Sequence, residues 1–100
     1  MIKRVMGMEI LEFEWDEEKN EINKRKRGID FNTALHVFDD EDRIEIYDIE
    51  HSVEEDRYNT IGRVHDILFV VYTERKDKIR IISARLASAA ERRLYYDYHG

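Results

Sequence analysis

Cysteine and proline are absent from this sequence, glycine occurs only four times in 100 residues, and no long apolar run is present. The lack of cysteine excludes a disulfide framework. No stretch approaches the roughly 18 apolar residues of a membrane span, and residues 1–8 lack the apolar core of a secretory signal. Because glycine and proline mark few breaks, we expect a single domain over residues 1–100. Without cysteines or a signal segment, the expected location is the cytoplasm.

Motifs for common cofactors are missing as well. There is no glycine-rich phosphate loop and no His-Glu-x-x-His, and the four histidines show no metal-ligand spacing, so no metal or cofactor is expected. The acidic run 39–42 resembles the start of a calcium loop, but Arg43 and Ile44 stand where such a loop needs an oxygen ligand and a glycine. We therefore interpret this run as a solvated loop.

Charge is abundant and unevenly placed. The net charge is −6, from 17 Lys and Arg against 23 Asp and Glu. Residues 1–56 hold 8 basic and 18 acidic side chains, whereas residues 57–100 hold 9 and 5. A basic surface in the C-terminal half fits contact with RNA or with a charged partner, and such segregation also arises without a function.

The N-terminal part predicts a strand followed by a helix. Apolar and acidic residues alternate over 10–15, which indicates a half-buried strand whose Phe13 and Trp15 are core residues or, alternatively, stack on RNA bases. Asp16 can cap a helix that ends at Gly28. Its apolar face is thin, so we expect dipole-matched charges and aliphatic stems to hold it.

Later patterns complete an α+β fold. A second helix from residue 30 places four apolar residues at i, i+3, i+4 and i+7, namely Phe31, Ala34, Leu35 and Phe38. Strands are predicted at about 43–49, 57–64, 66–74 and 78–85, followed by a helix at 88–98. Short turns between the last three strands favour hairpins. The predicted order is a strand, two helices, a four-strand antiparallel meander and a C-terminal helix.

The last strand and helix carry the richest chemistry. Arg80 and Arg85 lie an odd number of residues apart, so a regular strand would point them to opposite faces. On the helix, a buried stripe is predicted at Ala87, Ala90, Leu94 and Tyr98, and a second face carries Ser88, Glu91, Arg92 and Tyr95. That face could be a working surface, whereas Ser88-x-x-Glu91 is also a capping box. The guanidinium fork of Arg85 suits a phosphate; Arg80 suits RNA or an ion pair equally.

These motifs resemble those of the BrnT family of ribonuclease toxins over about residues 9–96. The similar positions are Phe13-Glu14-Trp15-Asp16, Lys19, Asn23, Lys26-Arg27-Gly28, Phe31, Ala34, Val37-Phe38, His51-Ser52, Arg57, Ile61-Gly62, Val71-Tyr72-Thr73-Glu74-Arg75, Arg80 to Arg85, and Glu91-Arg92. The family often has Lys-His-Gly where this chain has Lys26-Arg27-Gly28. Residues 1–7 lie outside the resemblance as an N-terminal extension, and Met8 is an alternative start.

The resemblance implies a RelE-like fold and metal-independent RNA cleavage that inhibits translation and growth. It implies a BrnA-like ribbon-helix-helix antitoxin, a complex of two toxins with two antitoxins, DNA contact only through the antitoxin, and no membrane. The catalytic residues that we predict are Arg57, Arg85, Glu91, His51 and Tyr95, with either Glu91 or His51 as the base. The predicted RNA-binding residues are Lys26, Arg27, Arg80 and Arg92. A non-catalytic interaction module or a plain RNA-binding module is the alternative.

Overall fold

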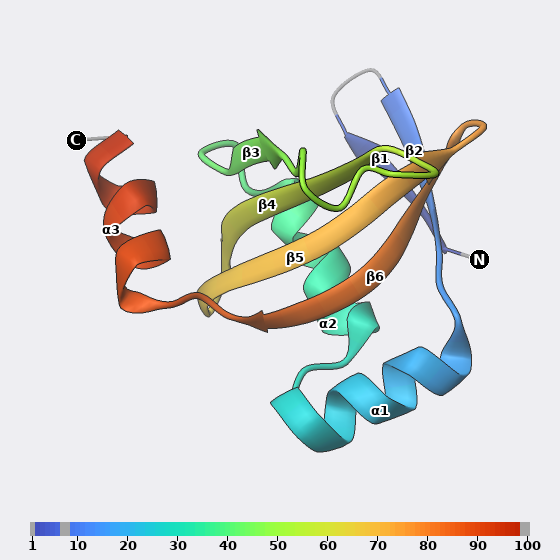
Figure 1. Cartoon of the computed structure of the whole chain (residues 1–100), viewed down its shortest axis with the longest axis horizontal. Coiled ribbons are helices and arrows are strands. Elements are labelled where there is room, and N and C mark those ends of the chain that lie inside the picture. Colours follow the sequence, from blue (N-terminus) through green and yellow to red (C-terminus); the bar gives the residue numbers. More distant parts are fainter. Residues whose placement is uncertain (1, 7–8, 99–100) are drawn as a thin grey trace.

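The computed structural model describes residues 2–6 and 9–98, whose strands form one six-stranded sheet in the order β1-β2-β6-β5-β4-β3 (Figure 1). Strands β3 to β6 form an antiparallel meander, and β2 joins its end in parallel to β6. The α+β class and the predicted order are thereby confirmed. The elements are β1 (Ile2–Met6), β2 (Glu9–Glu14), α1 (Glu17–Arg27), α2 (Phe31–Ala34), the 3-10 helix η1 (Leu35–Asp39), β3 (Ile44–Tyr47), β4 (Arg57–Val64), β5 (Asp66–Arg75), β6 (Lys78–Leu86) and α3 (Ala89–Tyr98).

Strand β1 is an addition that the sequence patterns do not predict. Residues 2–6, interpreted as part of an extension, pair antiparallel with β2 from Ile2 opposite Phe13 to Met6 opposite Glu9. The alternative start, Met8, lies outside the described residues. No helix in the described part of the chain is long and apolar enough to cross a membrane.

Helix α1 carries the expected dipole-matched charges, acidic in its first turn and basic in its last, and buried side-chain amides dock it onto the fold. Asp16 accepts hydrogen bonds from the amides of its first turn, and Gly28 ends it with a φ of 73°, as predicted. Asn20 and Asn23 are the buried residues of this helix, whereas Ile22 is 38% exposed. The apolar face is thin, as predicted, and two buried asparagines add contacts that the sequence pattern does not indicate.

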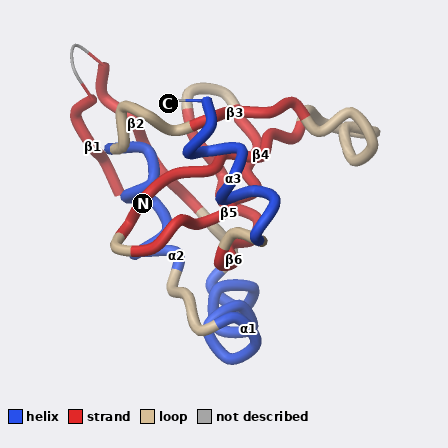
Figure 2. The backbone as a smooth tube through the Cα atoms, turned by 90° about the vertical axis from the view of Figure 1, so that its left-hand side faces the viewer, coloured by secondary structure: helices blue, strands red, loops and turns tan. Residues whose placement is uncertain are grey.

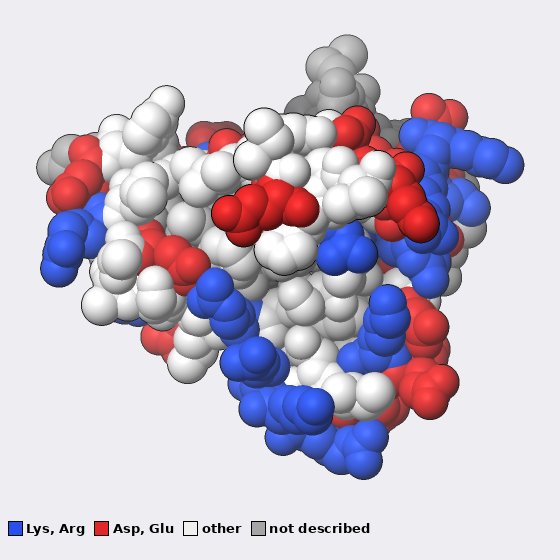
Figure 3. All heavy atoms as spheres, in the orientation of Figure 1, with Lys and Arg blue, Asp and Glu red and all other residues white. Residues whose placement is uncertain are grey.

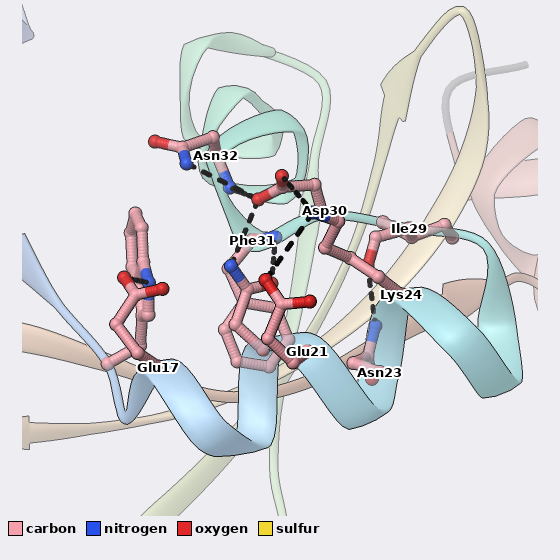
Figure 4. A network of polar contacts seen from close by, with 10 residues as sticks. Glu17, Glu21, Asn23, Lys24, Ile29, Asp30, Phe31 and Asn32 are labelled. Atoms are coloured by element: carbon pink, nitrogen blue, oxygen red, sulfur yellow. Dashed lines mark hydrogen bonds and ion pairs between the residues drawn. The ribbon is translucent and has the colours of Figure 1, made fainter.

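The two asparagines bind backbone of other segments, and Figure 4 shows the bond from Asn23 to Ile29. Asn23 donates to the carbonyls of Ile29, at 2.8 Å, and Ala84, at 2.9 Å, and it accepts from the Ala84 amide. Asn20 accepts from the Phe31 amide at 2.8 Å. Asn23 thus ties α1 to β6, and Asn20 fixes the start of α2.

The main core lies on one face of the sheet, beneath α2 and η1. All four apolar residues predicted for the second helix are buried there, at 2% exposure or less. Phe13 is fully buried against Phe38, and Trp15 packs edge-on to Phe31. Both aromatics therefore serve the core. Figures 1 and 2 show α2 on this side of the sheet and loop 48–56 on the other.

Helix α3 packs on one end of the opposite sheet face through Tyr95, and not through the stripe that the sequence predicts. Tyr95 is 5% exposed and packs with Ile44, Ile61 and Ile67. The predicted buried stripe is largely open to solvent, since Ala90 is exposed, Leu94 is 45% exposed and Tyr98 is 73% exposed. The prediction of that stripe was wrong because a ring with a polar tip, rather than the aliphatic side, meets the sheet.

Candidate functional site: a groove on the open sheet face

A bulge in β6 changes which residues share a face. The register with β5 shifts between Val71, opposite Ser83, and Tyr72, opposite Ile81, so one extra residue is accommodated in β6. Arg80 lies opposite Thr73 and Arg85 opposite Phe69, two β5 positions four residues apart. Directly paired residues share a face, so both arginines face the same side of the sheet. In a regular strand their odd spacing would place them on opposite faces, and the extra residue of the bulge brings them to the same face.

The open part of this face forms a groove of about 410 Å³. Loop 48–56 provides one wall, and strands β4, β5 and β6 provide the floor. Three predicted site residues meet there: Arg85 of β6, and His51 and Arg57 from a segment about 30 residues earlier in the chain. The other lining residues are Asp48, Glu50, Asn59, Phe69, Val71, Ile82 and Ser83. The groove therefore combines an apolar floor with two guanidinium groups and one imidazole.

Arg85 is held rigidly at the edge of this groove. Its Nη1 and Nη2 donate to the two carboxylate oxygens of Glu91 at 2.7 and 2.9 Å. The guanidinium carbon lies 4.0 Å from the centre of the Phe69 ring. Nη1 also donates to the Leu86 carbonyl, so the described residues use three of the five N–H donors of Arg85. The remaining two can donate to a ligand.

Glu91 has two structural tasks. It accepts from the Ser88 amide at 2.8 Å while its own amide donates to Ser88 Oγ, so the predicted capping box is present. The pKa of Glu91 lies below its ordinary value, chiefly because Arg85 donates to the carboxylate. The same pair raises the pKa of Arg85. A carboxylate held in its ionised form is a weak proton acceptor, which favours His51 over Glu91 as the base.

The Glu91 pair predicts a pH-dependent contribution to stability. Because the pKa in the folded state lies below the ordinary 4.5, the pair stabilises the fold above about pH 4.5, and this gain is lost as the pH falls through the lowered value. We expect Glu91→Gln to lower the free energy of unfolding by about 1 kcal/mol at pH 7. Urea unfolding from pH 3 to 7 should show a smaller loss of stability in acid for the variant than for the wild type; equal slopes would contradict the prediction.

His51 is oriented by the loop that carries it. Its Nδ1 lies 2.9 Å from Asp48 Oδ2, and its amide donates to Asp48 Oδ1 at 3.3 Å. Since a carboxylate only accepts, Nδ1 carries the proton and Nε2 is left as the acceptor. Desolvation raises the pKa of Asp48, but the bonds from His51 outweigh it and the net pKa is lowered. The imidazole is 63% exposed and free to meet a substrate.

Ser52 closes the base of this loop. Its Oγ donates to the Asp48 carbonyl at 2.6 Å and accepts from the Arg57 amide at 2.9 Å. The hydroxyl thus fixes the spacing between the residue that orients His51 and the start of β4. Within the described part of the chain, the Arg57 guanidinium makes no hydrogen bond or ion pair, although it lies near enough to Glu55 to help lower the pKa of that carboxyl.

Tyr95 lies outside the groove. Its hydroxyl donates to Asp40 Oδ2 at 2.6 Å, and desolvation together with this bond raises the pKa of Tyr95 to about 12. Asp40 also accepts from the Arg63 and Asp42 amides. One member of the acidic run 39–42 is therefore a partly buried anchor for α3, which corrects the interpretation of the whole run as solvated loop.

The predicted RNA-binding residues lie outside the groove, on α1, β6 and α3. Arg80 is 3.6 Å from Glu14 of β2, so the ion-pair alternative is present. Lys26 and Arg27 are exposed in the last turn of α1, and Arg92 is exposed on α3. Figure 3 shows Lys and Arg gathered on the lower part of the groove face, over α1. None of these four residues lines the groove itself.

The groove residues that the sequence reasoning missed include Asp48, Phe69 and Asn59. Asp48 could have been found from its position three residues before His51, a spacing at which one turn brings both side chains together. Phe69 lies in a strand that is apolar on both faces, which hides its role as the support of Arg85. Asn59 lies on the floor, where its Oδ1 is enclosed without a hydrogen-bond partner among the described residues.

Comparisons with known proteins concern the family and the fold of the chain. A family model described as the ribonuclease toxin BrnT of type II toxin-antitoxin systems matches residues 15–91. The crystal structure of the Brucella abortus ribonuclease toxin BrnT superposes with a TM-score of 0.61 at 24% identity, covering 78% of this chain and 97% of the other. That likeness shows a shared fold. No curated protein matches the sequence.

Proposed function

This chain belongs to the BrnT family of ribonuclease toxins of type II toxin-antitoxin systems, and we propose that it is itself an active, metal-independent endoribonuclease whose centre is the groove. The observation that carries the proposal is the convergence of Arg85, from β6, with His51 and Arg57, from a segment about 30 residues earlier in the chain, on one open surface. An imidazole beside two guanidinium groups is the combination that phosphodiester transfer requires.

The proposed reaction begins at the ribose 2′-hydroxyl. His51 Nε2 accepts its proton while Asp48 holds Nδ1 and stabilises the imidazolium that forms. The 2′-oxygen attacks the adjacent phosphorus, the bond to the 5′-oxygen breaks, and that oxygen takes a proton from solvent water, while the His51 imidazolium returns its proton to solvent. The products are a 2′,3′-cyclic phosphate and a 5′-hydroxyl, so no metal-bound water is needed for this route.

The two arginines stabilise the charge that develops on the phosphate. Arg57 has its guanidinium unpaired in the described contacts, and Arg85 is fixed in advance by Glu91 and Phe69. A donor held before the substrate arrives needs little reorganisation during the reaction, which is the condition under which such groups contribute most. In this proposal Glu91 positions Arg85, and Tyr95 positions α3 through Asp40.

Binding of the RNA backbone is assigned to the basic surface over α1. Lys26 and Arg27 are exposed there, with Arg92 on α3, and each contact with a phosphate releases counterions. Arg80 contributes only where its bond to Glu14 is exchanged for a phosphate. Because Arg27 takes the place of a histidine common in the family, we assign it phosphate binding rather than proton transfer.

The family implies an antitoxin partner. We propose that this antitoxin is BrnA-like, that two copies of each chain assemble, and that the complex contacts DNA only through the antitoxin. RNA cleavage in the cytoplasm would stop translation and growth, and the antitoxin would prevent it. An interaction or RNA-binding module without catalysis is the competing function.

Cleavage in the presence of a chelator tests the proposed function. Purified protein incubated with single-stranded RNA in excess EDTA should give fragments that end in a cyclic phosphate, which electrophoresis and end-group analysis detect. RNA that is retained but stays intact would establish the RNA-binding module. RNA that is neither bound nor cut, together with tight antitoxin binding, would establish the interaction module.

A further inference from the structure

Strand β3 and the loop after it form an unusual surface, which we call the acidic edge (residues 44–56). Of the large apolar side chains that the structure exposes, four lie within eight consecutive residues of it: Ile46 at 39%, Tyr47 at 47%, Ile49 at 78% and Val53 at 85%. Residues 44–56 also hold six carboxylates and neither Lys nor Arg. Apolar side chains gathered in this way mark a surface that is covered by a partner.

The backbone of the acidic edge is open as well. β3 is the last strand of the sheet on its side, so among the described residues its outer N–H and C=O groups have no neighbouring strand. Exposed edges are usually protected by lysine, proline or a bulge. β3 is short and carries Glu45, but it has no lysine, proline or bulge. Loop 48–56 projects from the sheet on the side away from α2 (Figure 2).

We propose that the acidic edge is the binding surface for the antitoxin, which adds an extended segment beside β3 in which basic and apolar residues alternate. The apolar side chains would cover Ile49 and Val53. The basic ones would pair with Glu50 and Glu54, which have no ion-pair partner in the described contacts. The proposal rests on the toxin–antitoxin pairing of the family and not on the cleavage mechanism.

Charge complementarity selects this occupant over two others. RNA phosphates would be repelled by carboxylates of the edge that no arginine pairs, such as Glu54, whereas Arg57 and Arg85 in the groove and the basic surface over α1 would attract them. Glu45 and Glu55 are already paired with Arg43 and Arg75. A second copy of this chain pairing through the same edge would place like charges opposite one another. A basic extended segment of the antitoxin would be attracted by the carboxylates and would also pair with the open backbone of β3. Once bound, it would lie against the loop that carries His51, and so close the groove wall without touching Arg85.

The test compares two pairs of substitutions that each place two lysines at exposed apolar positions. Ile49→Lys with Val53→Lys changes the acidic edge, and Leu94→Lys with Ile22→Lys is the matched control on α3 and α1. The probe is the antitoxin encoded in the neighbouring reading frame, titrated calorimetrically at physiological salt. We expect at least tenfold weaker binding for the edge pair and less than a twofold change for the control pair.

Several outcomes would overturn the assignment. Wild-type affinity of the edge pair, or loss of affinity in the control pair alone, would move the antitoxin to another surface. A wild-type dimer that only the edge pair converts to a monomer, without any loss of antitoxin affinity, would assign the edge to a second copy. Melting curves confirm that both variants fold. Because the readout is binding, a chain that leaves RNA intact would defeat the proposed cleavage and leave this surface standing.

Discussion

Arg85→Ala is expected to lower the rate of RNA cleavage by roughly 10²- to 10³-fold, because it removes a charge that is fixed before the substrate binds. Glu91 and Phe69 hold this guanidinium at the groove edge. Single-turnover cleavage of a short labelled RNA measures the effect. Arg85→Lys should recover only part of the rate, since an ammonium group cannot make the same two-pronged contact.

Arg93→Ala is the matched control for the loss of one positive charge. Arg93 is exposed on the same helix as Glu91 and is absent from the groove lining. Its substitution should change the rate by no more than a few fold. Both variants should retain the far-ultraviolet spectrum of the wild type. Full cleavage by a folded Arg85→Ala protein would remove Arg85 from the mechanism.

His51→Ala is expected to lower the cleavage rate by roughly 10²- to 10⁴-fold, the range that a general base contributes. Asp48→Asn should have a smaller effect in the same direction, because an amide orients the ring but does not stabilise the imidazolium. The measurement is again the single-turnover rate, at several values of pH. If His51→Ala cleaves at the wild-type rate, then the groove works with another base.

The chain contains a close control for His51. His36 pairs with Asp39 at the same spacing, with its Nδ1 3.1 Å from a carboxylate oxygen, and it is 45% exposed. It lies in η1, beside the main core and away from the groove. His36→Ala therefore removes an equivalent histidine–aspartate pair without touching the proposed centre, and it should cleave RNA normally. An equal loss in both variants would indicate a stability effect.

Local chemistry explains which parts of the fold could be predicted. The ends of α1 follow from Asp16 and Gly28, and the burial of Phe31 and Phe38 follows from their spacing, because each signal involves residues a few positions apart. The docking of α1 could not be predicted in the same way. It depends on Asn23 bonding Ala84, 61 residues away, and polar residues on a short helix look solvated in the sequence.

For the candidate site, the residues could be named from the sequence, but their meeting in space could not. Resemblance to the family supplied His51, Arg57 and Arg85, but nothing local indicates that they meet, since loop 48–56 must fold over β5 and β6 to bring them together. The common face of Arg80 and Arg85 depends on a strand register that only the paired neighbour defines. Which of these residues contact RNA stays a prediction.

The parallel pairing of β2 with β6 has a consequence for synthesis of the toxin. Phe13 lies opposite Ile79, so the central strand of the sheet can join β2 only after some 66 further residues have been made. Such distant contacts form slowly, and a chain on the ribosome cannot make them until β6 has left the exit tunnel. Arg85 lies in that same last strand. In the proposed mechanism a chain truncated before β6 lacks Arg85, so we expect RNA cleavage only from chains whose translation is nearly complete.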